Sequence, residues 1–184
     1  NKENSSRSTR WTLGIAGTYD QIFRVNGNNT PEPLTLVEDG RFLGEGERAT
    51  TDIIAGVTRV INRRTIAQFN LGFGISNGYM TDPYKVFSIV DAGGVEWDQY
   101  FEGRPDSRTR WTITANLNHM TFPGNNGIHL SYRYYSDDWD VKSHTLDYAH
   151  RFTFANADYL EPRIRLYAQS KAEFYHNSFV DSNI

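Results

Sequence analysis

Charged side chains alternate with aromatic ones over the last third of the chain, in stretches such as LSYRYYS and YLEPRIRLY. In a β-strand, alternate residues share one face, so these charges would gather on one side of a sheet. Pairing the last two strands around Ala155–Tyr159 places Arg151 opposite Arg163, an unfavourable juxtaposition that requires counter-charges, for which Asp147 and Glu161 are candidates. The charged residues that we expect to share this face are Arg133, Asp147, Arg151, Glu161, Arg163 and Arg165. This arrangement predicts either a salt-bridged polar filling of the lumen or a lumenal surface that attracts anions or docks a plug.

Three aspartates surround a tryptophan between two of these stretches: Asp137, Asp138, Trp139 and Asp140. Carboxylates are the ligands that calcium prefers, so an ion or a partner contact is one interpretation. The spacing does not match the twelve-residue calcium loop, because its glycine and its terminal glutamate are missing. We therefore favour a solvated hairpin turn in which Asp138 or Asp140 accepts hydrogen bonds from backbone amides. We predict neither a metal site nor a cofactor.

The histidines offer little further chemistry. No pair among His119, His129, His144, His150 and His176 has zinc-helix spacing. If Ser136 pairs with Lys142, Ser136 lies diagonal to His144, as in a Ser–His nucleophile. That face carries no Asp or Asn to orient the histidine, so we predict no enzyme and keep a hydrolase as a remote alternative. A histidine beside Tyr134 near a membrane interface is the simpler interpretation.

Composition excludes several classes of protein. The chain has 184 residues, enough for one domain, and a formal net charge of −3 with dispersed Lys and Arg, which argues against nucleic-acid binding. It has no cysteine, which excludes disulfides and thiolate metal sites. No apolar run approaches the roughly 20 residues of a membrane-spanning helix. The N-terminus, NKENSSRSTR, is polar and is not a signal peptide, so we expect that any export signal has been removed.

Alternation with a period of two is the dominant pattern and predicts an all-β protein. We expect seven strands, at Arg10–Val25, Arg48–Ile61, Ala67–Ile75, Ser107–Met120, Leu130–Ser136, Lys142–Phe154 and Leu160–Gln169, with long loops at 26–47 and 77–106. Their polar faces add Gln68, Asn70, Asn116 and Asn118 to the charged set. Gly72 and Gly74 fall on the same face, where we expect them either to relieve crowding or to permit strong local curvature.

The strand pattern favours a transmembrane β-barrel over a soluble sandwich. The expected strands are long, only every second residue is apolar, aromatic residues lie near strand ends, and longer connections alternate with short ones. Of the hairpin pairs, Leu130–Tyr148, Tyr132–Leu146 and Tyr134–His144 would then face lipid. Because single-chain bacterial barrels have an even number of strands, we expect that this chain contains only part of a barrel; the alternative is that it has one strand more than these seven.

Four blocks carry a resemblance to a known family: Thr81–Asp91, Arg104–Trp111, Leu130–Phe152 and Tyr159–Tyr175. They resemble the bacterial domain-of-unknown-function family three-five-seven-zero, whose members look like outer-membrane β-barrels, over about Asp52 to Tyr175. The resemblance implies export and an antiparallel barrel of the outer-membrane type. It brings no established activity and no catalytic residues, and family members are longer than this chain.

We therefore expect a barrel in the Gram-negative outer membrane, most simply a porin-like channel or transport-associated barrel with an Arg-rich polar lumen. The alternative is a structural or docking barrel with a filled lumen that binds a partner protein through its long loops. The expected partners are the lipid bilayer and other outer-membrane or periplasmic proteins, without nucleic acid.

Overall fold

The computed structural model describes residues 8–25, 31–33, 46–81, 86–91, 93–101, 103–121, 126–154, 158–175 and 179–180. Within these ranges every regular element is a β-strand, and none of them forms a helix long and apolar enough to cross a membrane. The strands are β1 (Thr9–Gln21), β2 (Phe23–Val25), β3 (Pro31–Pro33), β4 (Glu47–Asn62), β5 (Thr65–Gly78), β6 (Val86–Val90), β7 (Glu96–Phe101), β8 (Ser107–Thr121), β9 (Asn126–Asp137), β10 (Lys142–Thr153), β11 (Tyr159–Leu160), β12 (Arg163–Gln169) and β13 (Phe179–Val180).

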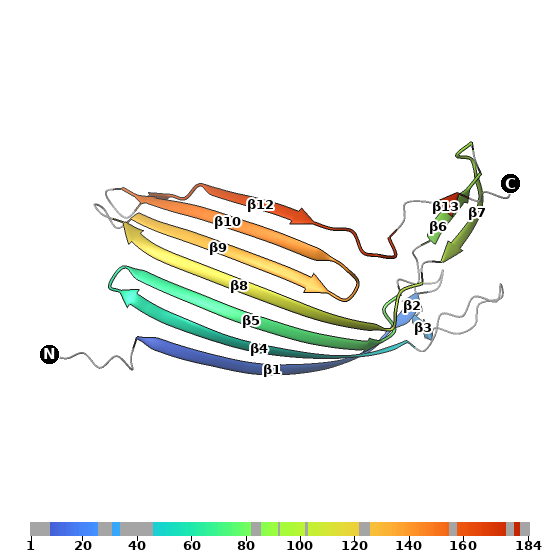
Figure 1. The fold of residues 1–184 in the computed structure, drawn as a ribbon, viewed down its shortest axis with the longest axis horizontal. Coiled ribbons are helices and arrows are strands. Elements are labelled where there is room, and N and C mark those ends of the chain that lie inside the picture. The colour runs from blue at the N-terminus through green and yellow to red at the C-terminus, as the bar shows by residue number, and fades with distance from the viewer. Residues whose placement is uncertain are drawn as a thin grey trace. The chain divides into compact units, whose positions relative to one another are not determined.

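The principal sheet has the strand order β1-β4-β5-β8-β9-β10-β11, and β12 also pairs with β10 (Figure 1). The seven predicted strands are therefore confirmed as seven neighbouring positions in one antiparallel sheet. β11 and β12 occupy the same edge of β10 and are separated by Glu161 and Pro162, since proline has no N–H to give to the ladder. Within the described residues the sheet is open, with β1 at one edge and β11 and β12 at the other.

Local sequence explains the hairpins of this sheet. The turn predicted at Asn62-Arg63-Arg64 joins β4 to β5, and the Asn62 side chain accepts a hydrogen bond of 2.9 Å from the amide of Arg64. The strands themselves are rich in threonine, isoleucine, valine and aromatic residues, the types that suit a pleated sheet.

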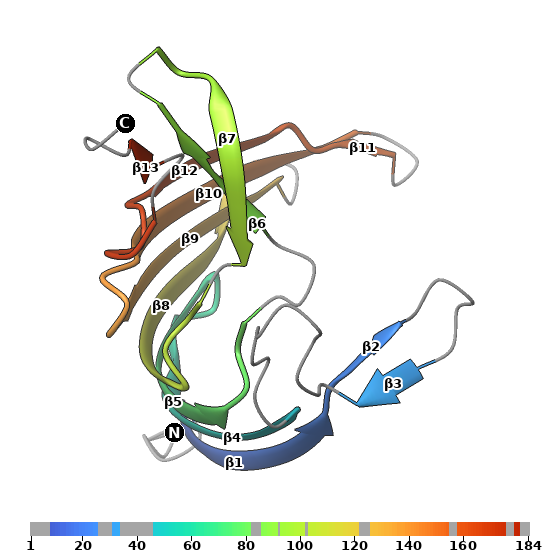
Figure 2. The ribbon, with the colours of Figure 1, turned by 90° about the vertical axis from the view of Figure 1, so that its right-hand side faces the viewer.

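The chain divides into two compact units. One comprises residues 1–16, 52–74 and 109–171 and contains β9, β10, β11 and β12 entirely. The other comprises residues 17–51, 75–108 and 172–184. It contains two small sheets, the ribbon of β2 with β3 and the three-stranded sheet β13-β6-β7 (Figure 2). The segments expected as long loops, 26–47 and 77–106, thus contain short strands of their own.

Exposure in the principal sheet is inverted relative to an ordinary soluble fold. Large apolar side chains point into solvent, among them Leu13, Leu71, Leu146 and Ile164. The buried residues of β5 and β10 are small or polar, and they include Ser76, Ser143, Asp147 and Ala149. Buried side chains therefore belong mainly to the polar faces of these strands.

Candidate functional site

The hairpin of β9 and β10 has the predicted register. Leu130 lies opposite Tyr148, Tyr132 opposite Leu146, and Tyr134 opposite His144. The neighbours β8 and β12 continue this register and create two faces, which we name after their side chains. The apolar face carries the rows Ile113–Tyr134–His144–Ala168, Ala115–Tyr132–Leu146–Leu166 and Leu117–Leu130–Tyr148–Ile164. The polar face carries the rows Thr114–Arg133–Thr145–Tyr167, Asn116–Ser131–Asp147–Arg165 and Asn118–His129–Ala149–Arg163.

Asp147 is the centre of an ion-pair network on the polar face. Its Oδ1 accepts a hydrogen bond of 2.8 Å from Nε of Arg163, and its Oδ2 accepts one of 2.9 Å from Nε of Arg165. The Asp147 side chain is 5% exposed, whereas those of Arg163 and Arg165 are 57% and 63% exposed. The prediction that Asp147 supplies a counter-charge is confirmed, and the network joins β12 to β10.

The predicted juxtaposition of Arg151 and Arg163 is wrong. Ala149 lies opposite Arg163, and Arg151 pairs with Glu161 at 2.7 Å between Nε and Oε2. The reason is the length of the turn: the amide of Phe154 donates to the carbonyl of Asp158, so Phe152 faces Leu160. This register is two residues away from the predicted one, which places a carboxylate opposite Arg151 in place of a like charge. Arg151 also lies 4.3 Å above the ring of Tyr159, a cation–π contact.

The predicted polar residues of β5 and β8 lie on the same polar face. Asn116 faces Ser131, and the Asn118 amide oxygen lies 2.8 Å from Nδ1 of His129. The Gln68 amide donates to that of Asn70 at 3.3 Å. All ten residues predicted to share this face are therefore in the first unit, on β5, β8, β9, β10 and β12, with Glu161 in the break before β12.

Glycines make room for a second ion pair on this face. Arg110 of β8 donates to Asp52 of β4 at 2.7 Å, across β5. Between them lies Gly74, where an added Cβ would stand 2.6 Å from Nε of Arg110 and would also meet the Asp52 carboxylate. At Gly72 the nearest atom to such a Cβ would be Cβ of Thr112 at 3.6 Å, which is ordinary contact. The crowding predicted around these glycines is confirmed at Gly74.

The polar face is hollowed between β8 and β12. A groove of about 410 Å³ is lined by Thr114, His129, Ser131, Arg133, Thr145, Asp147, Arg163, Arg165 and Tyr167. Three arginines and one aspartate give this lining a formal charge of 3 − 1 = +2 with histidine neutral. We call it the central groove. A further cavity of about 540 Å³ includes Arg63, Arg64, Arg151 and Glu161 in its lining.

Asp137 and Asp138 hold the hairpin turn at Trp139 together. Asp137, which we did not single out for this role, accepts hydrogen bonds from the amides of Trp139 and Val141 at 3.1 and 3.0 Å and from the Tyr135 hydroxyl at 2.7 Å. Asp138 accepts from the amide of Thr109 at 2.9 Å, as predicted. The turn is therefore tied to the start of β8 as well as to its own backbone.

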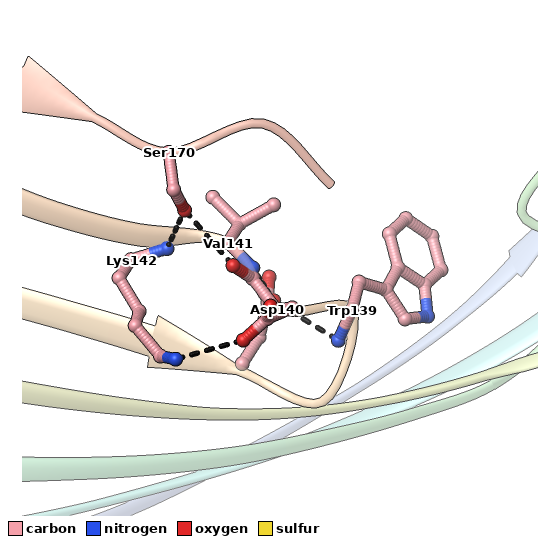
Figure 3. Close-up of polar contacts among 6 residues, drawn as sticks. Trp139, Asp140, Val141, Lys142 and Ser170 are labelled. Carbon is pink, nitrogen blue, oxygen red and sulfur yellow. Dashed lines mark hydrogen bonds and ion pairs between the residues drawn. The ribbon is translucent and has the colours of Figure 1, made fainter. Parts of the chain in front are cut away.

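The remaining aspartate of this turn bonds to a side chain. Asp140 has a left-handed φ of 61°, and its carboxylate accepts from Nζ of Lys142 at 2.8 Å, so of the two aspartates named in the prediction it is Asp138 that accepts from a backbone amide. This bond and the Asp140 charge raise the pKa of the Lys142 ammonium above its usual range. The Ser170 hydroxyl bridges the carbonyl of Asp140 and the amide of Lys142 (Figure 3). Trp139 is buried, and no cluster of three metal-binding side chains occurs among the described residues.

Histidines on the apolar face bond to neighbouring hydroxyls. Nδ1 of His144 lies 2.7 Å from the Tyr132 hydroxyl, and its ring is 5.1 Å from that of Tyr134. Ser136 pairs with Lys142 as expected. The described hydrogen bond of the His144 ring goes from Nδ1 to Tyr132 and not to Ser136. His176 lies outside the described residues.

Comparison with known proteins identifies the family. The family described as "Protein of unknown function (DUF3570)" matches residues 2–184, which extends the resemblance found in the sequence to nearly every residue. Neither the curated proteins nor the solved structures gave a significant match. The chain therefore belongs to the DUF3570 family, a family of unknown function.

Proposed function

We propose that this chain forms part of the wall of a bacterial outer-membrane β-barrel, with its apolar face toward lipid and its polar face toward the lumen. The inverted exposure of the sheet carries this proposal. Leu146 is 40% exposed while its neighbour Asp147 is 3% exposed, and on β5 Ile75 is 37% exposed while its neighbour Ser76 is 4% exposed. Water-soluble proteins rarely expose large continuous apolar surfaces, whereas membrane barrels turn apolar residues outward on every strand.

The height of the apolar face supports the same proposal. Its three apolar rows lie between the row Trp111–Ser136–Lys142 at one end and the row His119–Ile128–His150 at the other, and Phe152 and Leu160 continue the face past the second of these rows. The eight residue steps from Lys142 to His150 span about 27 Å along the strand, at roughly 3.4 Å per step. A tilt of about 40° reduces this to about 21 Å, close to the roughly 25 Å band of outer-membrane barrels.

A barrel of this kind requires that the two open edges be sealed, because lipid offers no partner to unpaired backbone groups. β1 and β12 occupy the first and seventh positions of an antiparallel sheet and therefore run in the same direction. To close the sheet into a barrel with antiparallel neighbours throughout, an odd number of further strands must therefore lie between β12 and β1. This agrees with the expectation that the residues described form part of a larger wall.

We propose a channel or transport-associated role for this barrel, with solutes passing along the polar face. The central groove and its excess of arginine support this role. The ion pairs of Asp147 and of Asp52 favour the second candidate, a docking or structural barrel whose lumen is filled. Both roles place the protein in the outer membrane.

Reconstitution into planar lipid bilayers separates the two roles. A channel gives discrete conductance steps that scale with salt concentration, whereas a filled barrel gives none. Fractionation of the cell envelope provides the accompanying control for location. Recovery of the folded protein in the soluble fraction would contradict the proposal of a membrane barrel itself.

A further inference from the structure

The central groove has hydrogen-bond donors that its own acid does not satisfy. The side chain of Arg133, whose backbone pairs with β8 and β10, has no hydrogen bond or ion pair among the described residues. Arg163 and Arg165 each bond to Asp147 through Nε alone. A guanidinium has five N–H groups, so most of the donors of these two exposed side chains remain available.

The strand register brings these donors to one place. Arg133 of β9 and Arg165 of β12 lie on either side of β10 in adjacent rows of the polar face, two strand spacings or about 10 Å apart across the sheet and two residues apart along it. Thr114, Thr145 and Tyr167 share the row of Arg133 and contribute three hydroxyls beside it, while Asp147 lies opposite Arg165. Both oxygens of Asp147 already accept from arginine, which reduces its repulsion of an incoming anion.

We propose that the central groove is a binding site for a small oxyanion, a carboxylate or a phosphate, held chiefly by Arg133 with Arg165 on the opposite side. Guanidinium groups match the planar, two-oxygen geometry of both anions. A volume of about 410 Å³ is within the usual range of small-molecule sites. This inference rests on the proposed function in one respect, which is that the bound anion is taken to be a solute of the lumen. Binding of the anion to the groove requires no open pore.

Binding is therefore measured first, by calorimetry on the detergent-solubilised protein with succinate and with inorganic phosphate as separate probes. We expect Arg133→Gln to weaken binding of the preferred anion about tenfold or more, through loss of charge-assisted hydrogen bonds. Arg133→Lys, which keeps the charge without the fork, is expected to bind with intermediate affinity. Arg59→Gln removes an equal charge from an exposed residue of β4 outside the groove and is expected to have no effect.

The outcomes separate this site from the channel. A preference for succinate or for phosphate identifies the class of oxyanion. Failure of both to bind the unaltered protein, or equal losses in Arg133→Gln and Arg59→Gln, would overturn the site even if the protein conducts. Arg133-dependent binding by a protein that never conducts would support the site and reject the channel. In a conducting protein, the bound anion should block chloride current, and Arg133→Gln should relieve the block.

Discussion

Replacing Leu146 by arginine tests directly whether the apolar face contacts lipid. Leu146 lies in the middle apolar row, four residues from Lys142 and four from His150. An arginine on the lipid side of a barrel costs about 2–4 kcal/mol at the bilayer midplane and about 0–1 kcal/mol near the interface. On a face in contact with water, a substitution at an exposed residue changes stability by only about 0.5 kcal/mol in either direction. The two environments thus differ by at least tenfold in the unfolding equilibrium.

The matched control is Ser136→Arg, on the same face but in the row that bounds the apolar band. Both variants are folded into phosphatidylcholine vesicles and unfolded with urea while tryptophan fluorescence is followed. We expect Leu146→Arg to lower the free energy of unfolding by about 2–4 kcal/mol and Ser136→Arg by less than about 1 kcal/mol. Equal values for the two variants, within about 0.5 kcal/mol, would refute the assignment of this face to lipid.

Three further substitutions test the polar face and the turn. Asp147→Asn weakens the bonds to Arg163 and Arg165, so we expect the substitution to accelerate backbone amide exchange, measured by mass spectrometry, more in β12 than in β8. Equal acceleration in the two strands would contradict a local role of Asp147. Gly74→Ala forces a Cβ against Arg110 and should cost about 1–3 kcal/mol in urea unfolding, while Gly72→Ala should stay within about 0.5 kcal/mol. Asp137→Ala leaves two backbone amides of the turn without an acceptor and should cost about 1–3 kcal/mol. Asp140→Asn is its control and should change thermal unfolding little, because the bond to Lys142 is exposed; equal losses in the two variants would show that Asp137 has no special part in the turn.

Sequence reasoning was most accurate where structure is local. The alternation of β9 and β10 gave their register, because the turn at Asp137–Val141 is short and fixes which residues face each other. It was wrong for β10 and β12, where the turn closes earlier, at Phe154 and Asp158. A small difference in turn length changed the position opposite Arg151 from that of Arg163 to that of Glu161, which sequence reasoning had named as a candidate counter-charge. Turn length, which alternation leaves open, was the missing information.

The part played by Asp137 had no distinct signal in the sequence. Three aspartates of similar spacing surround Trp139, and only backbone geometry decides which one faces inward. The same holds for Asp52 and Arg110, which are separated by 58 residues and meet because β4 and β8 flank β5. The pairing of β13 with β6 likewise joins segments about 90 residues apart and lacked a local pattern.

The sequence by itself determined that the chain is all-β, where its long strands lie and which side chains share a face, since the period of two is a property of each strand alone. The tertiary structure decided which strands are neighbours, which carboxylate neutralises which arginine, and that the apolar face is the exposed one. Those outcomes depend on turn closure and on strand neighbours brought together from distant parts of the sequence. The arginine-rich face thus became a groove with a defined lining and volume only when four strands were placed side by side.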